Sequence, residues 1–259
     1  MKKLAIIVPT KGKLMLLISL LNSIVYHSEY DRNNLKIYIA DTGSTDKEKE
    51  ITKNYLKRLK DEENLECVFI EYDYYNFSKI NNDVVKNHID KDTELILLCN
   101  NDIELINDAI SMCVKEYDEK TGTVGARLML KNNLVQHCGI TLVKGMPTHL
   151  FYKKPFPKVY EGKIVNTFGN TGAFMLVSKE LWDKIGGLNE EYERCFEDVE
   201  FNLSCLTNGK KNKTLYGAMC WHYESATREK EPLVKDVKKL IEFYKKIVSK
   251  TKEKNNIDK

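Results

Sequence analysis

Long hydrophobic runs are missing from this sequence of 259 residues. The longest nearly continuous apolar stretch is 14–21, far shorter than the roughly 18–20 residues that span a bilayer. An apolar run that starts at Leu4 stops at Pro9, before the core of a signal peptide could form, so we expect a first strand there. The sequence therefore predicts no transmembrane segment.

Paired cysteines and an excess of charge of one sign are also missing. The seven cysteines are an odd number and form no CxxC pair, which argues against a disulfide framework or a zinc knuckle. A reducing compartment, the cytoplasm, is expected. The net charge of +3 is too small for the clustered positive surface that nucleic acid requires, so the sequence predicts no nucleic-acid partner.

The first hundred residues alternate β-rich and helical stretches, which predicts a parallel sheet with crossover helices. Thr45 and Glu48 form a capping box, and apolar residues at steps of four follow it on one helical face. Asn107 is the expected N-cap of a later helix. Strands are expected at 4–9, 36–41, 66–72 and 94–100.

This alternation ends near residue 120. The segments 123–130 and 135–143 flank three polar residues and predict a hairpin. The segment 144–165 holds three of the five prolines and predicts a long loop, a candidate lid over a substrate. The remaining expected elements are helices at 181–185 and 196–206, a strand at 214–221, a helix from Pro232, and a frayed polar tail at 251–259.

Polar residues follow the predicted parallel strands, where ligands bind in open α/β sheets. The loop after the first strand matches neither the dinucleotide fingerprint nor the P-loop, because it contains one glycine. Asp41 could bind a base or ribose or could form a turn, and both interpretations stay open. Asn100–Asp102 could offer a hard oxygen ligand to Mg²⁺ or Mn²⁺ or could start a helix.

Nine short motifs, in this order and spacing, resemble the family 2 glycosyltransferases, with the rhamnosyltransferase-like branch as the nearest match. They cover roughly residues 4–230. The motifs are IIVPT at 6–10, ADTGSTD at 40–46, LLCNND at 97–102, VGARL at 124–128, VQHCG at 135–139, TGA at 171–173, GGLNE at 186–190, FEDVE at 196–200 and HYES at 222–225.

The resemblance implies a GT-A fold: a single α/β domain with a Rossmann-like, mostly parallel central sheet, crossover helices and a smaller antiparallel addition. It places this domain at 1–230, with a nucleotide-sugar-binding half at 1–106 and an acceptor-binding half at 107–230. An amphipathic helix and polar tail at 231–259 follow.

The resemblance also implies inverting transfer of one sugar from a nucleotide-sugar donor, UDP- or dTDP-linked, with a divalent cation, Mn²⁺ or Mg²⁺. The acceptor would be a hydroxyl of a glycan, lipid-linked glycan or protein in surface polysaccharide or glycoconjugate synthesis. Asp198 matches the catalytic base, Glu197 an acceptor-binding residue, and Asp102 and His222 the metal ligands. The donor-binding residues implied are Pro9, Thr10, Asp41, Lys79, Asn100, Asn101, Gly172, Ala173 and Arg228.

General chemistry agrees with one base, because an inverting transfer removes one proton from the acceptor while the diphosphate leaves from the opposite face. Structural interpretations stay open beside these roles. Glu197 and Asp198 could be a charged first helical turn, and His222 a satisfied histidine at a strand end. Lys79 and Arg228 could be solvated, and Gly172 could be a packing glycine.

Three positions depart from the family pattern: Asn189, Glu200 and Ser204 stand where Asp, Asp and Arg are usual. In the DXD-like motif only Asp102 keeps a carboxylate. A degenerate module that binds a glycan or partner without transferring sugar therefore stays open, as does a nucleotidyltransferase. The QxxRW signature of processive synthases is absent, which favours addition of a single sugar.

The C-terminal helix carries lysines that could be solvated or could touch the inner face of a membrane. They are Lys235, Lys238, Lys239, Lys245 and Lys246.

Overall fold

The computed structural model describes residues 1–223 and 234–257. Four strands run parallel in the order β3-β2-β1-β4, and each lies within one or two residues of its predicted position. Their bounds are β1 (Leu4–Thr10), β2 (Leu35–Asp41), β3 (Glu66–Glu71) and β4 (Leu95–Cys99). The predicted parallel half is therefore confirmed.

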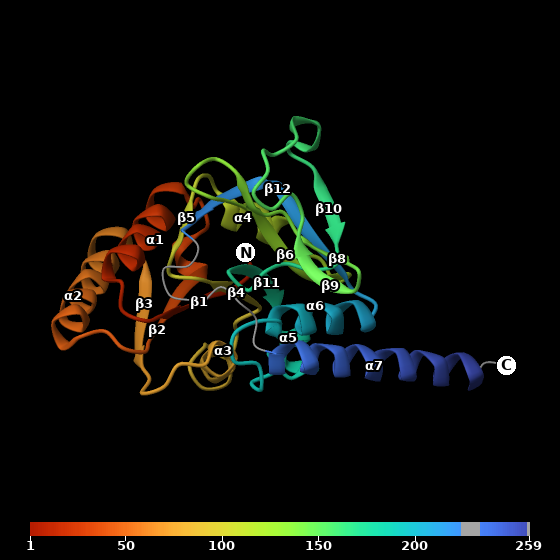
Figure 1. The fold of residues 1–259 in the computed structure, drawn as a ribbon. Helices are drawn as coiled ribbons and strands as arrows, with labels where there is room; N and C mark the ends of the chain where they lie inside the picture. The colour runs from red at the N-terminus through yellow and green to blue at the C-terminus, as the bar shows by residue number, and fades with distance from the viewer. Residues whose placement is uncertain (224–233, 258–259) are drawn as a thin grey trace.

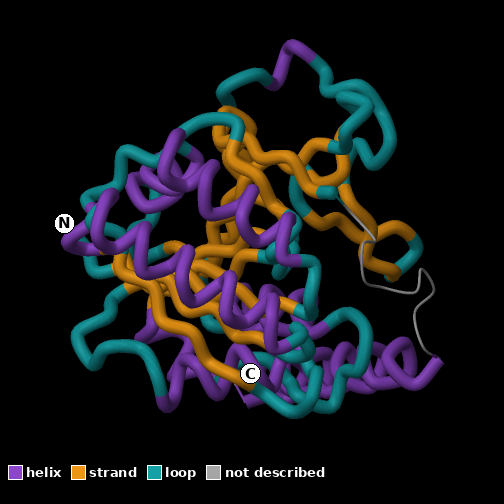
Figure 2. The backbone as a smooth tube through the Cα atoms, turned by 90° about the vertical axis from the view of Figure 1, so that its left-hand side faces the viewer, coloured by secondary structure: helices purple, strands orange, loops and turns teal. Residues whose placement is uncertain are grey.

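Helices cover both faces of this sheet (Figures 1 and 2). Side chains of β1 alternate between the two faces: Leu4, Ile6 and Val8 join the core beneath α1 and α2, whereas Ala5 and Ile7 join the core with α3, α5 and α6. The helix bounds are α1 (Leu14–His27), α2 (Asp46–Glu63), α3 (Phe77–Asn87), α4 (Ala109–Lys115), α5 (Lys179–Ile185), α6 (Glu197–Thr207) and α7 (Val234–Ile257).

The sheet continues past β4 with strands of both directions. β11 is antiparallel to β4 and to β6, β12 is parallel to β6, and β10 closes this edge. The short β5 and β7 pair with β12 and β6. The bounds are β5 (Ile103–Leu105), β6 (Thr121–Met129), β7 (Val135–His137), β10 (Ile164–Thr167), β11 (Phe174–Ser178) and β12 (Lys211–His222). A mostly parallel sheet with antiparallel additions is confirmed.

The structure corrects one predicted cap. The Thr45–Glu48 capping box is present at the start of α2. The N-cap of α4, however, is Asp108, whose side chain accepts from the backbone N–H of Ser111. Asn107 instead bridges to β12, donating to the Gly217 carbonyl over 2.8 Å and accepting from the Met219 N–H over 3.0 Å. Its tertiary partners outweigh the local capping preference.

The prediction of one strand at 135–143 and one loop at 144–165 was wrong. Gly139, with φ of 103°, separates β7 from β8 (Ile140–Val143). β8 then pairs with β9 (Met146–His149), which includes Pro147. Proline is compatible with this short strand because both strands of a two-stranded hairpin are edge strands. A 3₁₀ turn at Lys158–Tyr160 and β10 occupy the rest of the segment.

The helix α7 extends to Ile257, so the fraying predicted from residue 251 was wrong within 251–257. The predicted start at Pro232 lies outside the described residues. Leu240 packs into a cluster with Ile140, Tyr192 and Val199, so α7 contacts the β8–β9 hairpin and α6. The predicted division of the chain at 106/107 and 230/231 stays a prediction.

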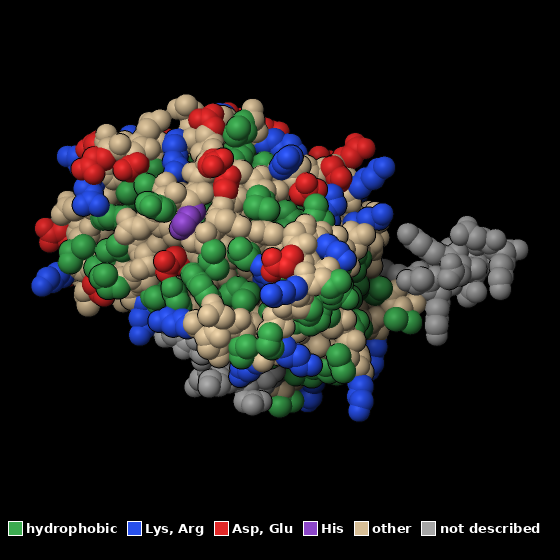
Figure 3. Space-filling view, turned by 90° about the horizontal axis from the view of Figure 1, so that it is seen from above, with side chains coloured by type: hydrophobic (Ala, Val, Ile, Leu, Met, Phe, Trp, Pro, Cys, Tyr) green, Lys and Arg blue, Asp and Glu red, His purple; other side chains and the backbone are tan. Residues whose placement is uncertain are grey.

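Two surface properties bear on function. Within the described residues, no helix combines the length and apolar content that a bilayer crossing requires. Seen from above, acidic and basic side chains intersperse with apolar ones, and no patch of one charge sign covers this face (Figure 3).

Candidate active site

The ends of β1, β2 and β4 meet at one edge of the sheet. Thr10 ends β1, directly after Pro9, and its hydroxyl accepts a hydrogen bond from Asn101 Nδ2 over 2.8 Å. The carbonyl of Thr10 accepts from the N–H of Thr42, which follows β2, over 2.9 Å. Three predicted donor-side segments are therefore adjacent.

Asp41 lies at this edge with 1% of its surface exposed. Its Oδ1 accepts from the Ser44 hydroxyl over 2.5 Å, and its Oδ2 accepts from the Ser44 N–H over 3.3 Å. This is the Asx-type turn that the sequence left open. The predicted contact of Asp41 with a nucleoside stays a prediction.

Asp102 and His222 form a buried pair beside this edge, each with 6% of its surface exposed. Asp102 Oδ1 lies 3.2 Å from His222 Nε2. Neither Asp102 Oδ1 nor His222 Nδ1 has a hydrogen-bond partner of good geometry among the described residues. Such orphaned buried polar atoms in a native fold point to an absent ion or water.

The pair fits a divalent cation. Two ligands in adjacent octahedral positions, each about 2.1 Å from Mg²⁺, lie about 3.0 Å apart, close to the separation observed. Carboxylate and imidazole suit Mn²⁺ as well. The described residues offer no cluster of three or more His, Cys, Asp or Glu ligands. Phosphate oxygens and water would therefore complete the coordination shell.

Asp198 lies in the first turn of α6 with its carboxylate held by two backbone amides. Oδ2 accepts from the Gly172 N–H over 2.9 Å, and Oδ1 accepts from the Val199 N–H over 2.8 Å. α6 has no side-chain cap, because the ring of its N-cap residue, Phe196, carries no hydrogen-bond acceptor. Asp198 therefore satisfies one of the free N–H groups at the start of its own helix.

A short path of contacts joins Asp198 to the Asp102–His222 pair. Gly172 donates to Asp198, and the carbonyl of the next residue, Ala173, accepts from the Asn100 N–H over 2.9 Å. Asn100 stands two residues before Asp102. A Cβ on Gly172 would lie 3.1 Å from the Phe77 ring, so this glycine permits the close packing between α3 and Asp198.

Most of the predicted site residues lie at the sheet edge or on the path just described. They are Pro9, Thr10, Asp41, Asn100, Asn101, Asp102, Gly172, Ala173, Asp198 and His222. Lys79 lies apart from them, because it is exposed on α3 with its Nζ 4.3 Å from the centre of the Tyr74 ring. Glu197 is buried beside Asp198. Arg228 lies outside the described residues.

Sequence reasoning missed a network of buried asparagines beneath α6. Asn170, Asn202 and Asn212 are fully buried. Asn202 Nδ2 donates to the carbonyls of Asp198 and Asn170 over 2.7 and 2.8 Å, and its Oδ1 accepts from the Thr123 hydroxyl over 2.6 Å. The network ties the helix that carries Asp198 to β6. Three isolated asparagines give no signal of it in the sequence.

Two departures from the family pattern contact each other. Asn189 Nδ2 donates to Glu200 Oε1 over 3.1 Å, and Tyr192 donates from its hydroxyl to Glu200 Oε2 over 2.8 Å. Asn189 and Glu200 therefore both stabilise the loop that leads into α6. On the other side of this loop, the buried Asp236 of α7 accepts from the N–H groups of Glu193, Arg194 and Cys195.

A cavity of about 160 Å³ opens beside Asp198. The β8–β9 hairpin contributes one side of it, including His149, whose Nδ1 lies 2.7 Å from Nδ1 of the buried His137. Burial, reinforced by the neighbouring His149 and His222, holds the pKa of His137 well below its usual value, so His137 is neutral at pH 7. No spacing or motif in the sequence predicts that these two histidines meet.

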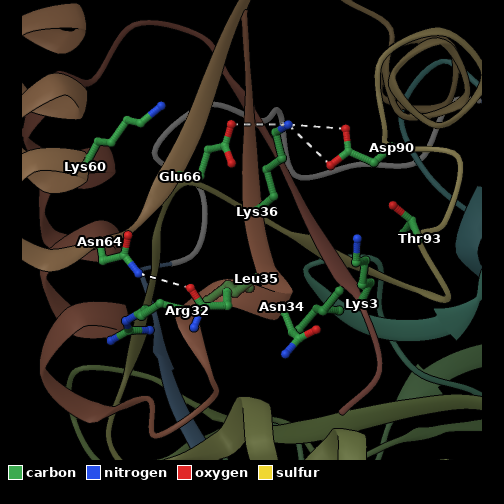
Figure 4. A pocket seen from close by; sticks show the side chains of 12 residues that line it. Lys3, Arg32, Asn34, Leu35, Lys36, Lys60, Asn64, Glu66, Asp90 and Thr93 are labelled. Atoms are coloured by element: carbon green, nitrogen blue, oxygen red, sulfur yellow. Dashed lines mark hydrogen bonds and ion pairs between the residues drawn. The ribbon is translucent and has the colours of Figure 1, made fainter.

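A second hollow lies at the opposite edge of the sheet, near the starts of β1 and β2 (Figure 4). There Lys36 Nζ lies between Glu66 and Asp90, at 3.3 and 3.2 Å from their carboxylate oxygens. Its cation is neutralised by these partners. Because ligands of open α/β sheets bind at the carboxyl ends of strands, this hollow is not the candidate active site.

The fold is that of the GT-A glycosyltransferases, as the comparisons with known proteins show. The chain belongs to glycosyl transferase family 2, whose model matches residues 5–186. It is 27% identical over 245 residues to the O-antigen biosynthesis protein RfbC of Myxococcus xanthus, covering 89% of this chain and 18% of that protein. It therefore spans about a fifth of that relative.

Solved structures share the fold. A Pyrobaculum calidifontis mannosyltransferase in complex with GDP-Man and Mn²⁺ matches with a TM-score of 0.62 and 14% identity, over 87% of this chain and 58% of that one. GalNAc-T7 with UDP, GalNAc and Mn²⁺ matches with a TM-score of 0.73 and 9% identity, over 93% and 48%. Staphylococcus aureus TarS with UDP-GlcNAc matches with a TM-score of 0.60 and 16% identity, over 90% and 60%. The predicted GT-A fold is confirmed.

Proposed function

We propose that this chain transfers one sugar, with inversion, from a nucleotide-sugar donor to a hydroxyl of a glycan, lipid-linked glycan or protein acceptor. The observation that carries the proposal is the path of contacts from Asp198 through Gly172, Ala173 and Asn100 to the buried Asp102–His222 pair. A base and a cation site joined by rigid backbone suit a reaction with an acceptor on one side and a diphosphate on the other.

Asp198 is the base in this proposal. It takes the proton of the acceptor hydroxyl, whose oxygen then forms the new bond to the anomeric carbon while the bond to the diphosphate breaks. The two backbone N–H groups on Asp198 fix the carboxylate in place, and each oxygen keeps a lone pair for the acceptor.

Asp102 and His222 are the proposed ligands of Mn²⁺ or Mg²⁺. A bound divalent cation supplies Lewis-acid stabilisation of the negative charge that develops on the leaving diphosphate. Thr10, Asp41 and Asn101, at the ends of the parallel strands, are proposed to hold the nucleoside. UDP- or dTDP-sugars are the proposed donors, and GDP- and UDP-linked sugars are bound by the similar structures.

The test is a thermal-shift titration with UDP, dTDP, GDP and CMP, each with and without Mn²⁺. A ligand at 100 times its Kd adds about 2.7 kcal/mol to the free energy of unfolding. We expect one nucleoside diphosphate to stabilise the protein in the presence of Mn²⁺, and Asp102→Ala to remove the metal dependence. Asp108→Ala, at the cap of α4, is the matched control. Stabilisation by none of the nucleotides would contradict the proposal.

We also infer that the protein acts in the cytoplasm, with the outer face of α7 against the inner membrane surface. Exposed Val234, Ile241 and Val248 alternate with exposed Lys238 and Lys245 at steps of three and four, so they share one helical face. Aliphatic side chains flanked by lysines suit an interface with anionic lipid. This placement supports a lipid-linked acceptor in surface polysaccharide synthesis.

A further inference from the structure

The two proposed metal ligands lie at the ends of neighbouring strands that share only a short ladder. β5 pairs with the end of β12 at three positions, and in the last of these Ile103 faces His222. One residue beyond this position, the N–H of Tyr223 donates to the carbonyl of Asp102 over 3.0 Å. The spacing between Asp102 and His222 therefore depends on how firmly the ends of β5 and β12 are joined.

The side chain of Tyr223 makes a second connection between these strands. Its hydroxyl donates a hydrogen bond to Oε2 of Glu104, the middle residue of β5. Tyr223 stands opposite Asp102, so Glu104 is its diagonal neighbour across the antiparallel pair, within reach of an aromatic side chain. Tyr223 therefore holds this segment at two points, Asp102 through its backbone and Glu104 through its hydroxyl.

Both the hydroxyl and the ring face of Tyr223 have charged partners. A hydrogen bond to an ionised carboxylate, such as that of Glu104, is stronger than a hydrogen bond between neutral groups. Lys131, in the turn between β6 and β7, places its Nζ 4.5 Å from the centre of the Tyr223 ring, where the ring attracts a cation. These two contacts favour one orientation of the ring.

We propose that Tyr223 and Glu104 are positioning residues for the divalent cation. Their hydrogen bond holds Asp102 and His222 close enough to share one ion, and this inference rests on the proposed function. The 3.2 Å between Asp102 Oδ1 and His222 Nε2 is already close to the spacing of adjacent ligands, so the site is preorganised. Residues that orient metal ligands without touching the metal change its affinity by about 10–100-fold when they are removed.

The test measures Mn²⁺ binding directly, by electron paramagnetic resonance of the free ion, with UDP, dTDP or GDP present. Tyr223→Phe removes a single oxygen atom and should weaken Mn²⁺ binding about tenfold. Tyr26→Phe, a change of a tyrosine that is 85% exposed on α1, is the matched control and should bind Mn²⁺ as the unchanged protein does. Equal Mn²⁺ affinities in Tyr223→Phe and the unchanged protein would overturn the inference.

Variants of Glu104 separate the hydrogen bond from the charge. Glu104→Gln keeps an oxygen that accepts from the Tyr223 hydroxyl and should retain most of the Mn²⁺ affinity, whereas Glu104→Ala should lose as much as Tyr223→Phe. The double variant Tyr223→Phe, Glu104→Ala should bind Mn²⁺ no more weakly than either single variant, because all three lack the same bond. Additive losses, or equal losses in Glu104→Gln and Glu104→Ala, would refute the role of this bond.

Urea denaturation without Mn²⁺ distinguishes positioning from general stability. A purely structural role of Tyr223 would lower the urea midpoint of Tyr223→Phe and leave the Mn²⁺ affinity of the folded protein unchanged, and that result would contradict the inference. If the unchanged protein binds no Mn²⁺ with any of the nucleotides, the proposed metal site fails. If it binds Mn²⁺ and Tyr223→Phe binds it as tightly, the proposed function stands and only the inference fails.

Discussion

Asp198 illustrates what a single residue needs in order to act as a base here. Its carboxylate is positioned by the Gly172 N–H, which comes from a segment 26 residues earlier in the chain. The FEDVE motif identified Asp198 by its resemblance to a family pattern. General chemistry added that an inverting transfer requires one carboxylate base. The amide partner could not be predicted, because no local pattern links a helix start to a distant turn.

The first prediction concerns this carboxylate. Asp198→Asn should lower the rate of sugar transfer by about 10²–10⁴-fold, because proton removal by a positioned base contributes this much. Nucleotide affinity should change little, since the nucleoside contacts are proposed at other strand ends. Steady-state kinetics and calorimetry measure the two effects. Asp183→Asn, on the exposed face of α5, is the matched control, and an equal loss of nucleotide affinity in Asp198→Asn would refute the base assignment.

The second prediction follows from the buried His137. Its pKa is lowered in the fold, chiefly by burial, so at mildly acidic pH the unfolded chain binds a proton that the folded chain does not. The contribution of His137 to the free energy of unfolding is therefore complete above pH 6.5 and is lost as pH falls below it, by up to about 1.4 kcal/mol per pH unit.

Urea denaturation at pH 7.5, 6.5 and 5.5 measures this loss. His137→Gln should flatten the pH dependence below 6.5, and His27→Gln, a change of the half-buried last residue of α1, should not. The same slope in all three proteins would show that His137 does not titrate in this way.

At the scale of elements, periodicity predicted most helices and strands, and tertiary contacts explain the failures. The predicted strand at 135–143 is broken at Gly139, where a Cβ would lie 2.4 Å from the Thr167 side chain. The hairpin at β8 and β9 was missed because Pro147 is a loop signal in the sequence. Asn107 was misassigned because its partners on β12 are 110 and 112 residues away.

The third prediction concerns the buried asparagine network that anchors α6. Asn202→Ala should lower the free energy of unfolding by about 2–3 kcal/mol, because the buried Thr123 hydroxyl and the N–H and carbonyl of Asn170 lose their hydrogen bonds to the Asn202 amide. Urea denaturation measures the change. Asn208→Ala, at the exposed end of the same helix, should cost far less, and equal losses would argue against the network.

The fourth prediction concerns the docking of α7. Asp236→Ala removes the acceptor for the N–H groups of Glu193, Arg194 and Cys195, so hydrogen exchange at these amides should accelerate at least tenfold. The transfer rate should fall while nucleotide affinity is kept, since this loop leads into the helix of Asp198. Glu242→Ala, on the exposed side of α7, is the control. Unchanged exchange in Asp236→Ala would contradict this role of α7.

At the scale of the whole molecule, the sequence predicted the sheet and the strand-end site because parallel strands bring their carboxyl ends to one edge whatever their separation in the chain. It could not predict how α7 packs, because an amphipathic helix indicates that one face is buried without naming its partner. The structure assigns the buried face to Leu240 and Asp236. The opposite face of α7 is then available to contact another surface.

The fifth prediction tests that face. The protein should sediment with vesicles containing phosphatidylglycerol and not with pure phosphatidylcholine, because the lysines of α7 add attraction to anionic lipid. Binding should be lost near 1 M salt, where the Debye length falls to about 3 Å. The double variant Lys238→Glu, Lys245→Glu should lose binding at low salt, whereas Lys47→Glu, Lys57→Glu on α2 carries the same change of net charge and should keep it. Equal losses in both would make the interaction a property of net charge, and retention by the α7 variant would place the lipid contact elsewhere on the molecule.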